Sequence, residues 1–178
     1  AEVRTTDGRR YPILGVTTRK GSWDLAVVRA AIPPEKSRPV IIRTDPPVEG
    51  EYVVAVGNPG GFDASFSDGI ISAIREFSNL TMIQITAPLA HGSSGGPVVD
   101  GNGRLLGLAM SVITAGHSED YYGFAISIRH LRDLAPIPLT SLADWRIPDE
   151  ETNGSRPSQP IPVTEASTDR YDRAIVLV

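Results

Sequence analysis

Ser94 is the side chain of this sequence best suited to act as a nucleophile. It lies in the run Gly92-Ser93-Ser94-Gly95-Gly96, between an apolar, β-branched segment at residues 82–86 and the sequence Pro97-Val98-Val99. Small neighbours give an acyl group access to the hydroxyl, and glycine permits the strained backbone that such a turn needs. The backbone N–H groups of Gly92 and Ser94 could then face a developing oxyanion. A flexible Gly/Ser turn is the simpler interpretation of the run taken alone, but the flanking strand pattern favours a nucleophile.

A carboxylate upstream could supply a second part of a catalytic triad. Asp24 precedes the apolar run Leu25-Ala26-Val27-Val28. An aspartate at the mouth of a strand can hold an imidazole in one tautomer. Considered alone, an aspartate in this position is more often an ordinary turn residue that caps a strand. Asp24 is therefore a catalytic candidate only in combination with Ser94.

Four segments, taken in order, resemble the trypsin-like serine proteases, and most closely their bacterial HtrA/Deg branch. They are Asp24-Leu25-Ala26-Val27-Val28, Ala55-Val56-Gly57-Asn58-Pro59-Gly60-Gly61 with Gly69-Ile70-Ile71-Ser72-Ala73, Gly92-Ser93-Ser94-Gly95-Gly96-Pro97, and Gly123-Phe124-Ala125-Ile126. The resemblance extends from residue 1 to about residue 134. It implies an all-β fold, a trypsin-like double six-stranded β-barrel with a short C-terminal helix. It also implies Ser94 as nucleophile, Asp24 as orienting acid, and Gly92 with Ser94 as oxyanion hole.

The histidine of such a triad is missing from the place where the resemblance implies it. A triad needs an imidazole within hydrogen-bond reach of the serine, and in this family the histidine comes before the aspartate. No histidine precedes Asp24, and residues 3–11 indicate a hairpin with an Asp7-Gly8 turn. We therefore expect the first barrel to be truncated at its N-terminus and the histidine to lie upstream of Ala1. The 178-residue chain alone should then be inactive or nearly so.

Three histidines are present that could substitute for the missing base. His91 lies three residues before Ser94, where the resemblance implies the lip of the specificity pocket. His117 lies in a polar loop near the rim of that pocket, and His130 lies in a short helix away from the cleft. We interpret all three as solvated surface residues. Every histidine titrates near neutral pH and so resembles a catalytic base wherever it occurs, which makes its presence alone weak evidence for that role.

The resemblance also implies a substrate pocket. Its base lies at Pro88, one wall is Ala109-Met110-Ser111, and His91 lies at its lip. None of these residues offers a carboxylate to Lys or Arg, so we expect a preference for small or medium aliphatic side chains. Ser93 stands where zymogen-activated members of the fold carry an aspartate that pairs with a new N-terminus. That route of activation is therefore not expected.

Composition argues against several other functions. The net charge is −4 and no block of Lys or Arg is present, which argues against nucleic acid or an anionic membrane as main partner. The absence of cysteine excludes a disulfide framework and a thiol-ligated metal site, and it favours the bacterial branch. No metal site or cofactor is expected, and no apolar run is long enough to cross a membrane as a helix. Localisation stays open: the resemblance favours a bacterial extracytoplasmic protein, whereas a module of a larger signalling protein would be cytoplasmic.

Short apolar runs separated by Gly, Pro and Asp turns predict barrels built from strands. Residues 1–43 would hold the C-terminal part of the first barrel, with strands at 11–17, 25–30 and 40–43, and residues 44–134 the second barrel. The apolar end of the chain either begins a further module beyond Val178 or docks back on the barrels as an edge strand. It follows a stretch of residues 135–178 with the Pro- and Ser-rich composition of a linker. The second barrel should contain six strands, at residues 52–57, 68–75, 82–86, 97–99, 104–112 and 121–127.

These patterns predict a serine endopeptidase that cleaves a protein or peptide substrate by acyl transfer, without a cofactor. Two other interpretations stay open. One is a catalytically inactive trypsin-like module that binds peptides or partners, and the other is a protease module of a larger multidomain signalling protein. The presence of Ser94 between its glycines weighs against the inactive module, because binding alone has no use for an oxyanion hole.

Overall fold

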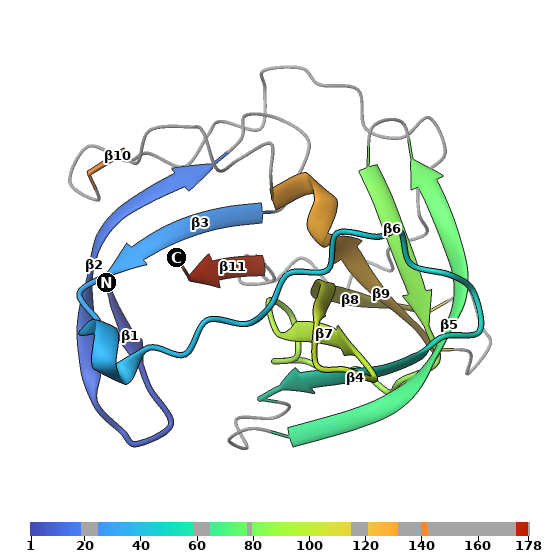
Figure 1. Ribbon diagram of the computed structural model, residues 1–178, viewed down its shortest axis with the longest axis horizontal. Coiled ribbons are helices and arrows are strands. Elements are labelled where there is room, and N and C mark those ends of the chain that lie inside the picture. The colour runs from blue at the N-terminus through green and yellow to red at the C-terminus, as the bar shows by residue number, and fades with distance from the viewer. Residues whose placement is uncertain are drawn as a thin grey trace.

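The computed structural model describes residues 1–18, 25–58, 65–77, 80–114, 121–131, 140–141 and 174–177 (Figure 1). The first sheet has five strands, in the order β1 (Glu2–Arg4), β2 (Arg10–Thr18), β3 (Leu25–Ala30) and β11 (Ala174–Leu177), with β10 (Thr140–Ser141) paired to β2. The hairpin expected at the start of the chain is confirmed: β1 pairs antiparallel with β2. Gly8 in its turn has a φ of 80°, in the region that favours glycine.

The second part is a closed barrel in the strand order β4, β5, β6, β9, β8 and β7, with every neighbouring pair antiparallel. The six strands expected from the sequence are therefore confirmed. Their bounds are β4 Tyr52–Gly57, β5 Ser65–Phe77, β6 Leu80–Ile85, β7 Pro97–Asp100, β8 Leu105–Thr114 and β9 Tyr121–Ser127. Alternation along each strand fills the barrel with aliphatic side chains, among them Val53, Ala55, Ile71, Ile83, Ile85, Val98, Leu106, Ala109 and Ala125.

The segment that joins the two sheets, residues 31–51, contains the short 3-10 helix η1 (Pro34–Lys36), and we call this segment the linker. The strand expected at residues 40–43 is wrong: Ile42 makes a single bridge to Leu105, and Ile41 is 70% exposed. Prolines at positions 39, 46 and 47 flank this stretch. Each proline lacks the N–H that a longer ladder would need.

Arg43 attaches this linker to the barrel. Its guanidinium is buried and donates to the carboxylates of Asp45 and Glu51 and to the carbonyl oxygen of Pro46. It also lies 3.6 Å from the buried carboxylate of Asp100, at the end of β7. One side chain therefore ties the linker to the turn between β7 and β8.

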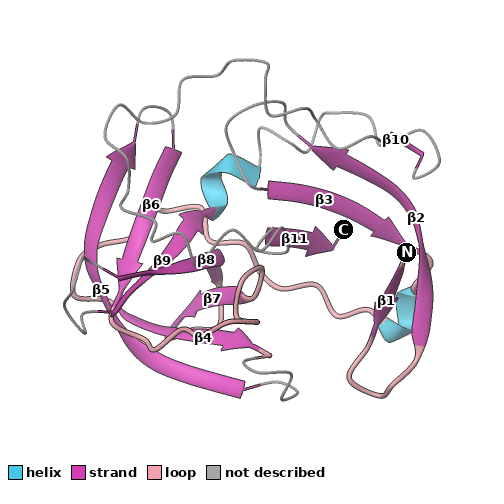
Figure 2. Ribbon diagram, turned by 180° about the vertical axis from the view of Figure 1, so that it is seen from behind, coloured by secondary structure: helices cyan, strands magenta, loops and turns pink. Residues whose placement is uncertain are grey.

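A second apolar cluster joins the first sheet to the barrel. Leu25 and Val27 of β3 pack with buried side chains of three barrel strands, namely Met82, Leu108, Phe124 and Ile126. The 3-10 helix η3 (Ile128–His130) follows β9 and lies beside the start of β3 (Figures 1 and 2). We call the six buried residues Leu25, Val27, Met82, Leu108, Phe124 and Ile126 the inter-sheet cluster. It fixes the strand that begins directly after Asp24.

The end of the chain returns to the first sheet. β11 pairs in parallel with β3, from Ala174 opposite Leu25 to Leu177 opposite Val28. This is the edge-strand arrangement, one of the two that the sequence left open. The division of the chain at residues 43 and 134 stays a prediction.

Candidate active site

The loop between β6 and β7 carries Ser94, and β5 holds the first part of this loop. Thr86 extends the ladder beyond β6: its N–H donates to the carbonyl of Ile70 at 3.0 Å, and its Oγ1 accepts the N–H of Ile70 at 2.9 Å. Ser67 Oγ then donates to the carbonyl oxygen of Pro88 at 2.7 Å. Gly69 is required beside them, because a Cβ at that position would overlap the backbone of Ala87.

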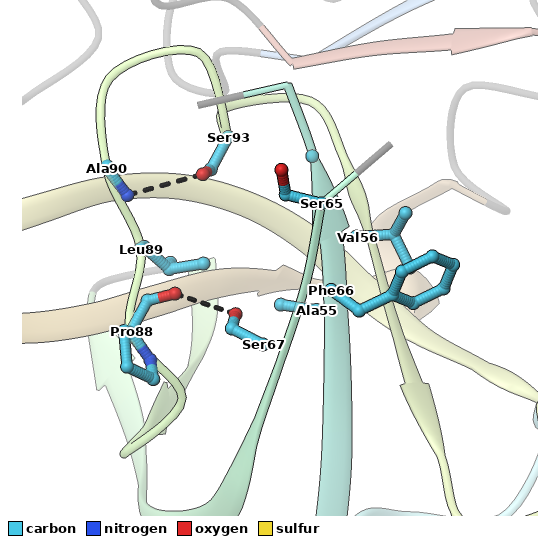
Figure 3. A pocket seen from close by; sticks show the side chains of 10 residues that line it. Ala55, Val56, Ser65, Phe66, Ser67, Pro88, Leu89, Ala90 and Ser93 are labelled. Atoms are coloured by element: carbon cyan, nitrogen blue, oxygen red, sulfur yellow. Dashed lines mark hydrogen bonds between the residues drawn. The ribbon is translucent and has the colours of Figure 1, made fainter. Parts of the chain in front are cut away.

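The next residues form a tight turn against the end of β4. The Ser93 N–H donates to the carbonyl of Ala90 at 2.9 Å, and Ser93 Oγ accepts the N–H of Ala90 at 3.2 Å (Figure 3). Gly92 has a φ of 93°, and its carbonyl accepts the N–H of Asn58 at 3.2 Å. A Cβ on Gly57 would lie 2.8 Å from the Cα of Ser93, so glycine lets the turn seat directly on the strand. Ser93 is consequently buried.

Two glycines after Ser94 lock the other side of the turn. Gly95 has a φ of 83°, and its N–H donates to the carbonyl of Ala109 at 2.7 Å. The N–H of Ala109 donates in return to the carbonyl of Gly96 at 2.8 Å. A Cβ on Gly96 would overlap the carbonyl oxygen of Val56. The two glycines are thus needed for different reasons, the first for its backbone angle and the second for close contact.

Ser94 is half-buried, and its Oγ donates a hydrogen bond of 2.6 Å to the carbonyl oxygen of Met110. Met110 is the extra residue of a β-bulge in β8, because Ala109 pairs with Ala125 while Ser111 already pairs with Phe124. Bulges re-aim backbone groups next to functional sites. Here the bulge accompanies a carbonyl group directed at the candidate nucleophile.

The backbone N–H groups of Gly92 and Ser94 donate to no backbone carbonyl within the described part of the chain. Donors that are held in place and not already used are what a developing oxyanion requires. The turn therefore combines a hydroxyl with two amide donors. A general base is the remaining requirement for acyl transfer.

The described residues bring no imidazole to Ser94 Oγ, whose hydrogen bond goes to a backbone carbonyl. His91 is exposed, as expected, on the turn itself. His130 corrects the expectation of a solvated histidine: it is only 4% exposed, because its Nε2 accepts the backbone N–H of Thr81 at 2.8 Å. Asp24 and His117 lie outside the described residues.

Whether the expected pocket residues together bind a substrate side chain stays a prediction; the structure gives the surroundings of each. Pro88 is exposed, and Met110 is partly buried against the inter-sheet cluster. The side chain of Ala109 lies in the barrel core, and its backbone forms hydrogen bonds with Gly95 and Gly96. The backbone of Ser111 pairs with Phe124 opposite it.

A cavity of about 240 Å³ lies behind the turn, and Pro88, the expected base of the substrate pocket, is one of the residues that line it. It lies between β4, the start of β5 and the loop at Pro88, Leu89 and Ala90, with Ser93 on its wall (Figure 3). The spacing of Ser65, Ser67 and Gly69, small residues on one face of β5, is the sequence signal that could have indicated it. Within the described ranges, no three His, Cys, Asp or Glu side chains could together hold a metal ion. No helix among those residues is long and apolar enough to cross a membrane.

Comparison with known sequences identifies related proteins. Residues 1–108 match the family described as "Trypsin-like peptidase domain". "Serine protease HtrA-like" of Staphylococcus epidermidis is 32% identical over 148 residues, which cover 74% of this chain and 25% of that protein. "Periplasmic pH-dependent serine endoprotease DegQ" of Escherichia coli is 31% identical over 138 residues, covering 75% of this chain and 30% of that protein. The chain thus spans less than a third of the length of these two relatives.

Solved structures give the same fold. The solved structure "HtrA-type protease AlgW with tripeptide" matches with a TM-score of 0.59 and 25% identity over 74% of this chain and 45% of that one. A protease from M. tuberculosis in its active form matches with a TM-score of 0.63 over 79% of this chain and 64% of that one. At 22% identity, the second match supports the fold alone.

Proposed function

This chain belongs to the trypsin-like peptidase family, in its HtrA-related branch, and we propose that it provides the nucleophile of a serine endopeptidase. The observation that carries this proposal is the turn at Ser94. A hydroxyl stands there beside two backbone N–H groups that make no hydrogen bond to a backbone carbonyl in the described residues. Three glycines, at positions 57, 95 and 96, support that geometry.

In the proposed mechanism, Ser94 Oγ attacks the carbonyl carbon of a peptide bond while a histidine takes the hydroxyl proton. We assign this histidine to sequence that precedes Ala1 in the natural protein. Asp24 orients the imidazole, and the N–H groups of Gly92 and Ser94 bind the tetrahedral oxygen. The imidazolium then gives its proton to the leaving amine, and water releases the acyl group from Ser94 by the same steps.

The bond from Ser94 to Met110 describes a resting nucleophile. A serine hydroxyl has one proton to donate, so the proton directed at the Met110 carbonyl is not directed at a base. Rotation of the Ser94 side chain would exchange this bond for one to the histidine. Loss of a single neutral hydrogen bond costs about 0.5–1.5 kcal/mol, which is small beside the effect of a positioned base.

The proposed substrate is a protein or peptide with a small or medium aliphatic side chain at the cleaved bond. The residues proposed to contact that side chain include no carboxylate; they are Pro88, His91, Ala109, Met110 and Ser111. An apolar pocket discriminates by only about 1–3 kcal/mol per methylene. A peptide-library profile should therefore be broad within aliphatic residues, and a profile dominated by Lys or Arg would contradict the assignment.

One observation favours a second candidate, an inactive module that binds peptides. Within the described residues, Ser94 Oγ contacts a backbone carbonyl and no imidazole. Such a module would keep the peptide-binding surface and lack reactivity at Ser94. The two candidates differ in one measurable property, the reactivity of the hydroxyl.

A fluorophosphonate probe measures this reactivity directly. The natural protein, with the sequence that precedes Ala1, should be labelled, and Ser94→Ala should abolish the labelling. Ser72→Ala, on an exposed position of β5, is the matched control and should be labelled at the rate of the unmodified protein. Labelling that persists in Ser94→Ala removes Ser94 from the mechanism, and a natural protein that is never labelled supports the inactive module.

A further inference from the structure

His130 is a buried titratable group that the proposed mechanism does not use. It ends the short helix η3, and only 4% of it is exposed. Its Nε2 accepts the backbone N–H of Thr81 at 2.8 Å. A backbone N–H can only donate, so Nε2 carries no proton in this structure and the imidazole is neutral.

The bond between His130 and Thr81 spans 49 positions of sequence and joins η3 to the start of β6. The next residue after His130, Leu131, packs against the inter-sheet cluster. The residue before Thr81, Leu80, packs against the same cluster. The hydrogen bond therefore holds together two side chains that close the cluster containing Leu25 and Val27 of β3.

The same cluster reaches the candidate nucleophile. Met110 packs against it, and the carbonyl of Met110 accepts the hydrogen bond from Ser94. β3 begins at Leu25, directly after the candidate acid Asp24. Both sides of the proposed site are thus attached to the cluster that the His130 bond closes.

Several charged groups near this bond make hydrogen bonds or ion pairs of their own. Glu76 of β5 accepts from Thr81 Oγ1 at 2.8 Å and from Arg129 Nη2 at 2.9 Å. Arg75 donates to Gln84. The described residues of β6 and β8 contain no titratable side chain. Two groups of the linker, Arg43 and Asp45, line a cavity of about 290 Å³ together with Thr81 and Arg129, and they pair with each other.

We propose that His130 is a proton-sensitive positioning residue, which clamps η3 to β6 when neutral and releases the inter-sheet cluster when protonated. A proton on Nε2 would place two N–H donors opposite each other, so protonation and the bond to Thr81 exclude each other. Free histidine takes up its proton near pH 6.5. The bond between His130 and Thr81 is therefore favoured above that pH, and protonation of Nε2 competes with it as the pH falls below that value.

Linkage gives the size of the expected effect. If the folded chain keeps His130 neutral, the unfolded chain binds one more proton below about pH 6.5, so stability falls with decreasing pH. Between pH 7.5 and 5.0 this single group raises the unfolding equilibrium constant by up to about 30-fold.

Urea unfolding at the two pH values tests the clamp without any use of catalysis. His130→Gln is the informative variant, because the glutamine Oε1 can accept the Thr81 N–H but takes up no proton. We expect the pH-dependent loss in the unmodified chain and in the control His91→Gln, and its absence in His130→Gln. A His130→Gln chain that keeps the full pH dependence would overturn the proposal.

The only two methionines of the chain, Met82 and Met110, both lie at the inter-sheet cluster and report on it directly. Their ¹³C-methyl resonances should shift between pH 7.5 and 5.0 in the unmodified chain and stay in place in His130→Gln. If that variant does not fold, the unmodified chain decides alone through the ¹⁵N signal of His130 Nε2. Protonation of His130 with no change at the Thr81 amide or at either methyl would overturn the proposal.

The consequence for Ser94 rests on the proposed function and is measured separately. Fluorophosphonate labelling of the natural protein should fall more steeply on acidification in the unmodified protein than in His130→Gln. Absence of labelling at every pH would contradict the proposed function while the unfolding and methyl measurements still decide the clamp. An equal pH profile in both proteins, with labelling present, would contradict the link between clamp and site.

Discussion

Replacing Arg43 by methionine tests whether one buried guanidinium holds the linker on the barrel. The side chain is 6% exposed, and methionine keeps much of its apolar stem while removing every donor. Asp100 is not left alone by this change, because Arg104 Nε and the backbone N–H groups of Asn102 and Arg104 still donate to it. Glu51 and Asp45 lose a partner but stand closer to water, with 30% and 53% of their side chains exposed.

These exposures set the magnitude. Removing one partner of a fully buried ion pair costs about 3–5 kcal/mol. Solvent screens the two partly exposed carboxylates, so we expect Arg43→Met to lower the free energy of unfolding by about 2–3 kcal/mol. The matched control is Arg10→Met, which removes a pair with Glu2 whose side chains are 66% and 49% exposed. Surface pairs of this kind contribute at most about 1 kcal/mol.

Urea unfolding at pH 7 and at lower pH measures both the cost and its origin. The hydrogen bonds from Arg43 hold the pKa of Glu51 below its usual range. Burial acts to raise the pKa of Asp100, but the bonds from Arg104 and Asn102 outweigh it and lower that pKa, and these bonds remain in Arg43→Met, so the pH dependence of the difference comes from Glu51. A carboxyl group with a lowered pKa stabilises the fold above its ordinary pKa and loses that contribution as the pH falls through the folded value. The difference in free energy of unfolding between the unmodified chain and Arg43→Met should thus have its full size at pH 7 and become smaller below about pH 4. A gap no larger than that of Arg10→Met, or one unchanged at pH 3, would refute this reasoning.

Two further changes test the turn and the chain end. Gly96→Ala should destabilise the fold by about 1–3 kcal/mol or more, because the added Cβ overlaps the Val56 carbonyl. The control Gly101→Ala should unfold like the unmodified chain in urea, since its Cβ would lie 3.7 Å from the Tyr52 ring, an ordinary contact distance. Equal urea midpoints for the two variants would contradict the close-contact argument. Ending the chain at Arg173 removes β11, so amide protons of β3 should exchange faster and the urea midpoint should fall. If neither changes, the residues from Ala174 onward belong to a separate module.

The barrel could be predicted from the sequence because its signal is local. Each strand carries its own alternation of apolar residues, and Gly or Asp turns separate the strands. The same reasoning failed at residues 40–43, where the run is apolar but only Ile42 finds a partner, Leu105. An apolar run forms a strand only if a neighbouring strand pairs with it through backbone hydrogen bonds along its whole length. No local pattern contains that information.

The turn that carries Ser94 could also be predicted, since its glycines lie within two residues of Ser94; the role of Ser94 as nucleophile stays a prediction. The features that local patterns do not predict are those whose environment is set from far away in the sequence. His130 was expected in water, yet its environment depends on Thr81, 49 positions earlier. The hydrogen bonds of the Ala109 backbone to Gly95 and Gly96 are equally nonlocal, because they join strand β8, beside its bulge at Met110, to the turn at Ser94.

The bulge at Met110 links these observations in one physical argument. An uninterrupted strand β8 would place successive side chains on alternate faces, and the extra residue interrupts that alternation beside Ser94. The carbonyl of Met110 accepts from Ser94, while its side chain packs against the cluster that also contains Leu25 and Val27. One residue therefore connects the hydroxyl to the contact between the two sheets. Any change that loosens that contact, whether at His130 or at the start of β3, should be felt at Ser94 before the barrel itself unfolds, because the barrel has a separate core of its own.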